Sequence, residues 1–395
     1  MQMRFRETKM IITSQAEMSA EAVKAQSFER LLDAVRKNRT QFSRDQQISA
    51  EVVQLMREAG FYRALVTKRL GGDELSPMAF LRMVERLSEV DGSAGWVASF
   101  GFSAVYLSAL PVATLQQIYA DGPDVVFAGG IFPPQKAAVV EGGLEVSGRW
   151  SWGSGSTGAD IIGVGIKVDG DASGGLPLIA VMPASKVQIE PNWDVIGMKG
   201  TGSHDMVVDR VVVSRDWTFI RGGKSSLDEP LCQYPTMALA AQVLAVVALG
   251  TARGAIDVLS DMAGARGSIT GAANFAERPY FQTDIAKAEA LLRSARAFFY
   301  EITEEAYTTL LAGDELTARQ RALLRLASTN AARTGADVAL AVYRLSGTTG
   351  IVHDHMIARH MQDAMVVPQH AFLADGTWQN AGRVLLGMES PPGFP

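Results

Sequence analysis

Histidines gather in one short segment of this 395-residue chain, where four of the five lie between positions 353 and 370. These histidines and the carboxylates beside them are His353, His355, His360, Asp363, His370 and Asp375. The segment follows a glycine-containing break at 346–350, SGTTG, which ends a long apolar stretch. Titratable side chains collected next to a helix break are typical of active sites, so this segment is the first candidate for chemistry.

A metal site is the first chemistry to weigh. On a continuous helix His353 and His360 share a face, whereas His355 lies roughly 160–200° away from both, at about 100° per residue. Neither the H-E-x-x-H spacing nor that of a facial triad is present. Cys232 is the only cysteine, which excludes a thiolate site and a disulfide framework. We therefore expect no bound metal.

The second candidate is the loop Gly148–Asp160, GRWSWGSGSTGAD, at the end of a predicted strand. Its glycines let the backbone approach a flat ligand, and Trp152 can lie against a ring system. Ser154 and Ser156 can donate hydrogen bonds to ring heteroatoms. The alternative is a hairpin corner around a core tryptophan, which the composition alone favours.

Other nucleotide and nucleic-acid sites are excluded by the pattern. No G-x-G-x-x-G follows a strand and opens a helix, so no internal NAD(P)H site is expected. Gly222–Ser225 resembles the end of a P-loop, but Thr218 stands where that motif requires glycine. The net charge is −5 with both signs mixed along the chain, which leaves no basic face for nucleic acid.

The elements that position these residues change type twice along the chain. Residues from about 20 to 121 have helical periodicity, residues 125–213 form short β-rich runs, and helical periodicity returns at about 235. Gly142–Gly143 predicts a hairpin between two alternating runs. The pattern predicts an α+β chain with a helical domain (1–124), an antiparallel β-sandwich or barrel (125–234) and a four-helix bundle (235–395).

The chain carries no clear export or membrane signal. Its first 19 residues lack a continuous apolar region, which predicts a frayed leader and not a signal peptide. The most apolar run, Met237–Gly250, is too short to span a bilayer. With a single cysteine, we expect a cytoplasmic protein that does not bind membranes.

Several stretches together carry a family resemblance. Helical, β and four-helix-bundle domains in this order resemble the acyl-CoA dehydrogenase fold. DGSAGWVAS (91–99), GGLEVSGRWSWGSG (142–155) and WDVIGMKGTGSHDMVVDRVVV (193–213) resemble one branch, the two-component (group D) flavin-dependent monooxygenases. Arg359, Asp363 and His370 match the branch's last motif, the first two as structural partners. The likeness covers nearly the whole chain from about residue 25, and the order and spacing of the motifs are more specific than any one motif.

The resemblance implies a reduced FAD or FMN, supplied by a separate reductase and bound between the β domain and the bundle. Trp152 and Ser154 would face the isoalloxazine, with Ser154 near N5 and Ser156 beside it. Arg266 and Gln282 match positions that reach the cofactor of a neighbouring subunit, with an exposed loop charge as the alternative for Arg266. Gly347 and Thr348 match a turn near the cofactor, and a homotetramer is implied.

One absence separates the branches of this fold. Dehydrogenases need a positioned carboxylate base in this segment, but AMVVPQHAFL (364–373) has none between Asp363 and Asp375. His370 lies there instead, and an imidazole that titrates near neutrality suits acid or base work on a C4a-hydroperoxyflavin or an activated ring substituent. We predict His370 and Ser154 as the catalytic residues. A helix histidine with no catalytic role is the alternative for His370.

The expected substrate pocket contains Trp96, Phe100 and Ala104. Phenol hydroxylases of this branch tend to have a histidine about eight residues after the tryptophan of the G-W pair, where this chain has Ala104. The more apolar pocket favours hydroxylation or epoxidation of an indole-like or polycyclic aromatic by O₂ over that of a simple phenol. An acyl-CoA dehydrogenase or oxidase, an N-oxygenase of an amino sugar and a scaffold without flavin are the alternatives.

Overall fold

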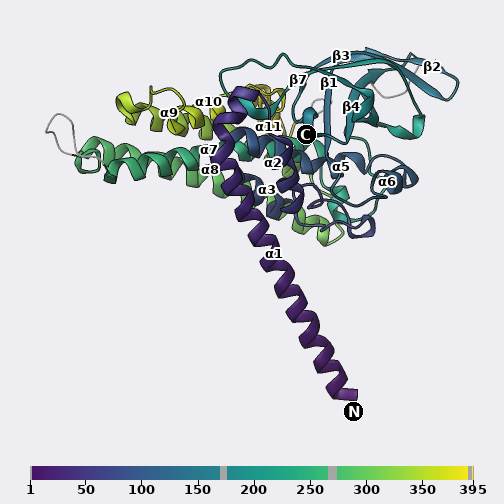
Figure 1. The fold of residues 1–395 in the computed structure, drawn as a ribbon, viewed down its shortest axis with the longest axis horizontal. Helices are drawn as coiled ribbons and strands as arrows, with labels where there is room; N and C mark the ends of the chain where they lie inside the picture. The colour runs from purple at the N-terminus through teal and green to yellow at the C-terminus, as the bar shows by residue number, and fades with distance from the viewer. Residues whose placement is uncertain (1, 170–175, 266–273, 390–393, 395) are drawn as a thin grey trace.

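The computed structural model describes residues 2–169, 176–265, 274–389 and 394 (Figure 1). Its helices are α1 (Gln2–Asp45), α2 (Ala50–Glu58), α3 (Pro77–Ser88), α4 (Gly92–Ser99), α5 (Ser103–Leu107), α6 (Val112–Ile118), α7 (Thr236–Ala265), α8 (Pro279–Leu311), α9 (Ala318–Leu345), α10 (Met356–Val366) and α11 (Gly376–Leu385). Its strands are β1 (Phe127–Lys136), β2 (Ala138–Val140), β3 (Gly143–Gly153), β4 (Ile161–Lys167), β5 (Leu178–Pro183), β6 (Gln188–Glu190), β7 (His204–Val213) and β8 (Thr218–Ile220).

The N-terminal helices begin where the sequence supplies caps. The Ser49 hydroxyl accepts from the amide of Val52, Ser76 accepts from Ala79, and the Asp91 carboxylate starts α4. The expected frayed leader is wrong, because α1 is helical from Gln2 and runs away from the body of the molecule (Figure 1).

The middle region is made of two four-stranded sheets. Their strand orders are β1-β4-β5-β8 and β2-β3-β7-β6. The predicted hairpin is present, with Val140 paired to Gly143 and both glycines, Gly142 and Gly143, at positive φ. The expected antiparallel pairing has one exception, since β1 and β4 run parallel. Between β1 and β4 the chain crosses to the other sheet and forms β2 and β3 there before it returns. The two strands are therefore joined by a crossover and not by a tight hairpin, which allows them to run parallel.

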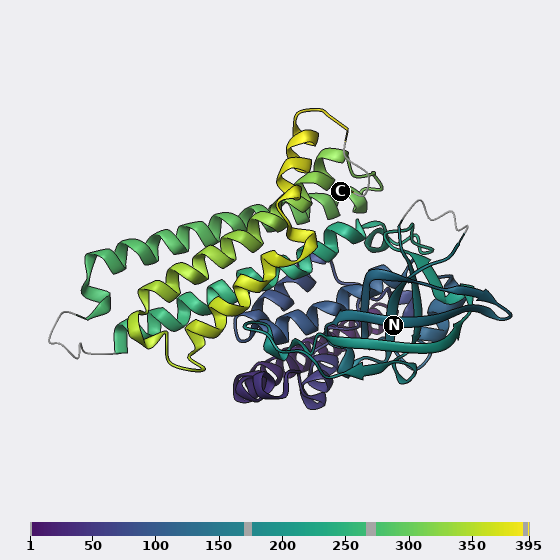
Figure 2. The ribbon, with the colours of Figure 1, turned by 90° about the horizontal axis from the view of Figure 1, so that it is seen from above.

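The C-terminal helices α7, α8, α9 and α10 lie side by side as the expected bundle, and α11 packs on α9 (Figure 2). Within the described residues one helical segment, Thr236–Gly264, is long and apolar enough to cross a membrane. In this fold 94% of its most apolar window is buried, as expected for a core helix.

The hydrophobic core crosses the proposed boundary between the helical regions. One cluster combines residues of α1 to α4, such as Leu31, Met56 and Leu81, with residues of the bundle, such as Val246 and Phe299. A second cluster joins α5 and α6 to the first sheet, and a third fills the space between the sheets. We keep 1–124, 125–234 and 235–395 as a proposed division, although the two helical parts share one core.

A buried network of charges fixes α10 against the N-terminal helices. Asp363 accepts a 2.6 Å hydrogen bond from the amide of Met198, which lies just before the short turn 199–201. Arg359, one turn earlier in α10, donates to Asp91 at 3.2 Å and to the carbonyl of Arg39 at 2.6 Å. Burial raises the pKa of Asp363, and the neighbouring Asp91 raises it further. Arg359 and Asp363 therefore join α1, α4 and α10, as expected of structural partners.

A second buried pair joins α3 to α8. Glu85, whose side chain is 5% exposed, binds both Nε and Nη2 of Arg296, at 2.7 and 3.0 Å. The Tyr300 hydroxyl donates to the same carboxylate at 2.7 Å. Removing the carboxylate would leave a buried hydroxyl and a cation that is 45% exposed without their partner.

We predict that Glu85→Ala lowers the free energy of unfolding by about 3 kcal/mol, the low end for a broken buried pair, because Arg296 is partly exposed. Denaturant unfolding followed by circular dichroism measures the change. The control is Glu29→Ala, because Glu29 pairs with Arg86 where both side chains are 54% exposed. A loss at Glu85 no larger than that of the control would contradict the structural role of the pair.

The buried side chain of His360 makes the stability of the fold sensitive to pH. Burial lowers the pKa of His360 to about 3, and the nearby Arg39 and Arg359 lower it further. The unfolded chain therefore binds a proton that the folded chain does not, so stability is lost as pH falls from about 6.5 toward 3, by at most about 1.4 kcal/mol per pH unit. Asp363 and Glu89, whose pKa values are raised, act in the opposite direction.

We therefore predict that the difference in stability between His360→Gln and the parent chain changes with pH. Relative to the parent chain, His360→Gln should gain stability steadily as pH falls from 6.5 to 4.5, while the difference stays constant above pH 7.5. Urea midpoints at matched pH values measure this difference. Parallel curves for the two proteins over the whole range would show that His360 does not titrate on unfolding.

Candidate functional site

His370 lies between α10 and α11, where it caps a short turn at 371–373. Its Nδ1 accepts a 3.2 Å hydrogen bond from the amide of Phe372, so the ring proton of neutral His370 is on Nε2. Burial lowers the pKa of His370 to about 4, and the nearby cations Arg221 and Arg325 lower it further. The expectation of a histidine that titrates near neutrality is therefore wrong, because burial and the two arginines keep the side chain neutral at physiological pH, where it presents Nε2–H as a donor.

Aromatic rings surround this histidine. The centroid of the His370 ring lies 6.1 Å from that of Trp96 and 5.0 Å from that of Phe372. Phe102 and Tyr106 form a second ring pair, with centroids 5.4 Å apart. Phe372 and Phe102 each pack against both the first and the second core cluster, so the two sets of rings, called the aromatic row below, lie where these clusters meet.

The predicted substrate residues belong to this same row. Trp96 lies within α4, Phe100 opens a turn at 100–102, and Ala104 lies in α5. The Phe100 ring lies 6.3 Å from that of Phe102, and Phe100 and Ala104 are both half-buried. The assignment of Trp96, Phe100 and Ala104 to substrate binding stays a prediction.

Trp152 owes its position to a β-bulge. Between the pairs Trp150–Met206 and Gly153–His204, β3 has one more residue than β7. Trp152 has φ +69° there and is 67% exposed, whereas Trp150 is fully buried and donates to the carbonyl of Gly165. Trp150 is therefore the core tryptophan of the hairpin interpretation, and Trp152 offers an open ring face, so that cofactor binding by this loop stays a prediction.

The loop that carries Trp193 supports this ring. Trp193 packs edge-on against Trp152 at 5.5 Å between centroids. The fifth histidine, His204, holds the loop, because its Nδ1 accepts from the amides of Asn192 and Trp193 at 3.1 and 3.0 Å. Burial lowers the pKa of His204, which keeps this acceptor unprotonated.

Ser154 heads a chain of buried hydroxyls. Its Oγ lies 2.6 Å from that of Ser203, which lies 2.7 Å from Oγ1 of Thr201. Thr201 donates to the carbonyl of Met198 at 2.9 Å. Because Thr201 uses its proton on that carbonyl, Ser203 must donate to Thr201, and Ser154 must donate to Ser203. The expectation that Ser154 donates to a ligand is therefore wrong, because its proton is used on Ser203 and it can only accept a further hydrogen bond.

The residues present fit a flavin. The buried Ser156 hydroxyl has no partner within the described part of the chain, so a polar ligand atom would satisfy it. Trp152 supplies an open apolar ring, and Ser154 an acceptor suited to the N5–H that a flavin carries only when reduced. The roles of Trp152, Ser154 and Ser156 stay predictions.

Other predicted cofactor residues lie elsewhere in the chain. The first turn of α8, which carries Gln282, and the turn 347–349 lie at the end of the bundle away from the β domain (Figure 2). Gln282 is exposed and donates to the carbonyl of Ala276. Gly347, at φ +59°, and Thr348 are therefore not brought to Trp152 within one chain. Arg266 lies outside the described residues.

The remaining histidines do not form a metal site, and no cluster of potential ligands occurs in the described residues. The assumption of one continuous helix over this segment was wrong, because α10 begins only at Met356. His353 lies in the preceding turn, 90% exposed and paired with Asp354, and His355 is the N-cap of α10. His360 is buried against α7, where a Cβ on Gly254 would meet its ring at 2.8 Å.

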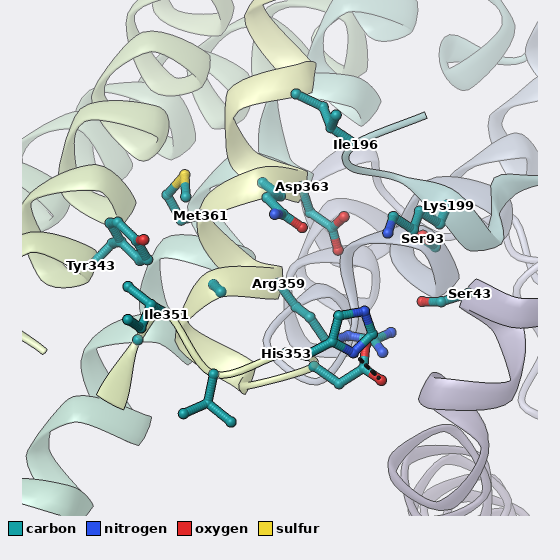
Figure 3. Close-up of a pocket in the computed structure, with 15 residues that line it drawn as sticks. Ser43, Ser93, Ile196, Lys199, Tyr343, Ile351, His353, Arg359, Met361 and Asp363 are labelled. Carbon is teal, nitrogen blue, oxygen red and sulfur yellow. Dashed lines mark ion pairs between the residues drawn. The ribbon is translucent and has the colours of Figure 1, made fainter. Parts of the chain in front are cut away.

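A hollow of about 240 Å³ lies beside α10 (Figure 3). Ser93, Lys199, Arg359 and Asp363 point into it, and it contains none of the predicted catalytic residues. It is distinct from the row of rings beside His370.

Arg221 and Arg325 are the site residues that the sequence reading missed. The guanidinium carbons of Arg221 and Arg325 lie 4.8 and 5.7 Å from the centroid of the Phe372 ring. Arg325 lies on the buried face of α9 with Ala322, Ser328 and Ala332. A cation at helical spacing among these small residues was the sequence signal that could have identified it as a buried charge. Arg221, in the turn after β8, gave no comparable signal.

Comparison with known proteins agrees with this geometry. Residues 13–116 match the sequence profile of the acyl-CoA dehydrogenase N-terminal domain, and residues 242–375 match that of the C-terminal domain. An indole-3-acetate monooxygenase of Pseudomonas putida is 54% identical over 370 residues, 93% of this chain and 95% of that protein. One of Acinetobacter baumannii is 46% identical over 355 residues, 90% and 91% of the two chains.

Solved structures show the same fold. XiaF from Streptomyces, in complex with FADH2 and glycerol, has a TM-score of 0.88 at 19% identity and covers 98% of this chain and 100% of its own. TdsC from Paenibacillus, with FMN and indole, has a TM-score of 0.79 at 20% identity and covers 94% and 98%. The family predicted from the sequence is confirmed, and the chain belongs to the flavin-dependent monooxygenases of the acyl-CoA dehydrogenase fold.

Proposed function

We propose that this flavin-dependent monooxygenase oxygenates the indole ring of indole-3-acetate. The observation that carries the proposal is the 54% identity, over 93% of the chain, to an indole-3-acetate monooxygenase. The row of Trp96, Phe102, Tyr106 and Phe372 supports it, because flat aromatic side chains suit a flat bicyclic ring.

The charges near His370 argue against the dehydrogenase alternative. The groups that shift its pKa besides burial are two arginines, Arg221 and Arg325. Asp375, the next carboxylate along the chain, is 81% exposed and pairs with Arg333 at 2.8 Å. A base strong enough to remove a proton next to a thioester is therefore missing from the described surroundings of His370.

A bound reduced flavin supplies the two electrons that let O₂ place one oxygen atom on the ring and release the other as water. This chain's residues would do the rest. Trp152 would support the cofactor ring, and Ser154 would accept its N5–H. His370 would orient the oxygen being transferred through a hydrogen bond from Nε2–H. The proton that the substrate ring loses would be taken up by the oxygen atom that is released as water. The aromatic row would exclude water from the reacting atoms.

Further parts of the proposal concern partners. We propose a separate flavin reductase, with either FADH2 or reduced FMN as the cofactor, and a homotetramer in which Gln282, Gly347 and Thr348 serve a neighbouring copy's site. Exposed apolar side chains at the same end of the bundle, including Tyr280 and Ile351, support such an interface. The lone buried Cys232 supports a cytoplasmic location.

The activity is tested with purified chain, a generic flavin reductase, NADH, flavin and ¹⁸O₂. We predict that indole-3-acetate gains one ¹⁸O atom, measured by mass spectrometry, and that His370→Ala lowers kcat at least about 100-fold. The matched control is His353→Ala, which removes an exposed histidine and should keep full activity. Absence of ¹⁸O from every product of the parent enzyme would overturn the proposal.

The hydroxyl chain makes a separate prediction about flavin affinity. Ser154→Ala should weaken binding of reduced flavin about 3- to 10-fold, one neutral hydrogen bond, and weaken oxidised flavin less, because only the reduced form has an N5–H to donate. Anaerobic and aerobic titrations measure both constants. Ser147→Ala, which changes a hydroxyl earlier in β3 that binds the amide of Arg210, is the control. An equal loss for both redox forms would contradict the assigned direction of the chain.

A further inference from the structure

Three buried N–H groups near His370 have no acceptor in the described residues. They are Nε1 of Trp96 and the Nε atoms of Arg221 and Arg325. A buried donor without a partner costs about 1–3 kcal/mol, so such groups are rare in folded proteins. Their concentration around one short segment indicates that an acceptor-rich ligand belongs there.

Arg325 is the strongest of these observations. Its residue is 6% exposed, and its only hydrogen bond to the described residues runs from Nη2 to the carbonyl of Phe372, at 3.0 Å. The rings of Phe372 and Phe394 lie on the guanidinium, and no carboxylate among the described residues pairs with it. Burial lowers the pKa of Arg325 to about 10, the direction expected of a cation without a counter-ion.

Arg221 approaches the same ring. Its guanidinium carbon lies 4.8 Å from the centroid of Phe372 and 5.1 Å from that of Phe132, and it too has no carboxylate partner among the described residues. The two cations therefore share one phenylalanine as a neighbour, and Arg221 makes the charge on Arg325 less stable. The local balance of charge needs an anion.

We propose that Arg325, with Arg221 beside it, binds the carboxylate of the substrate and so selects aromatic acids over neutral aromatics. The inference rests on the proposed function, because it concerns the substrate of the same site. A planar guanidinium matches a carboxylate in shape and charge, and its attraction is strongest where water is excluded.

The geometry also says where the rest of the substrate lies. The Phe372 ring centroid lies 4.8 and 5.7 Å from the guanidinium carbons of Arg221 and Arg325, and 5.0 Å from the centroid of the His370 ring. A carboxylate at Arg325 leaves an aromatic ring joined to it by a short linker within reach of His370 and Trp96. Binding of the acid group thus fixes where the aromatic ring lies relative to the reacting atoms.

An uncharged acceptor accounts for the site less well. A flavin carbonyl or an amide could satisfy one orphan N–H, but it would leave two positive charges uncompensated. The carboxylate differs because it supplies several lone pairs and the missing charge together.

The test compares an acid with its neutral counterparts. Arg325→Met keeps the length and much of the apolar packing of the side chain. We expect it to raise KM for indole-3-acetate about 10- to 100-fold, and to change KM for indole and indole-3-acetamide less than about 3-fold. Arg325→Lys should recover part of the loss, and Arg221→Met should show a smaller loss with the same preference. The control is Arg321→Met, an exposed arginine one turn earlier in α9.

Thermal unfolding of the same variants distinguishes a binding role from a structural one. Removing an unpaired buried cation should leave the melting temperature of Arg325→Met unchanged or raised. Loss of all three substrates together, or a fall in melting temperature with that loss, would overturn the proposal. A parent enzyme that oxygenates none of the three would instead overturn the proposed function.

Discussion

The hydrogen bond from the amide of Met198 to Asp363 connects most of the site. The carbonyl of the same Met198 accepts from the indole of Trp193 and from Thr201, so one residue holds both the support of Trp152 and the end of the hydroxyl chain from Ser154. Asp363 also lies in α10, seven residues before His370. A shift of α10 would therefore disturb the histidine and the expected cofactor surface together.

The position of the site follows from how the cores meet. His370 lies where the cluster shared by the two helical regions approaches the cluster that joins α5 and α6 to the first sheet. Side chains common to both, Phe102, Ala104 and Phe372, are only half-buried in this chain. A site between two core clusters can hold an apolar substrate without disrupting either cluster, because the substrate would cover side chains that both clusters leave half-buried.

Much of this arrangement could be predicted from the sequence. The change of periodicity near residues 125 and 235 separated helices from strands, and Gly142–Gly143 placed the hairpin between β2 and β3. What failed had local physical reasons. An alternating strand puts Trp150 and Trp152 on one face, and the single-residue bulge that separates them has no clear signal in sequence. Arg221 and Arg325 come together only through tertiary packing around Phe372, which no spacing along the chain expresses.

The direction in which the hydroxyls from Ser154 to Thr201 donate their protons has a consequence for how the oxygenase and its proposed reductase exchange a diffusible flavin. If Ser154 accepts the flavin N5–H as proposed, its contribution to affinity would disappear when the cofactor loses that hydrogen at the end of each turnover. Exchange then has a built-in direction, with capture favoured before oxidation and release favoured after it. A serine whose proton is already used within the protein would thus favour binding of the reduced cofactor and release of the oxidised one, without any moving lid.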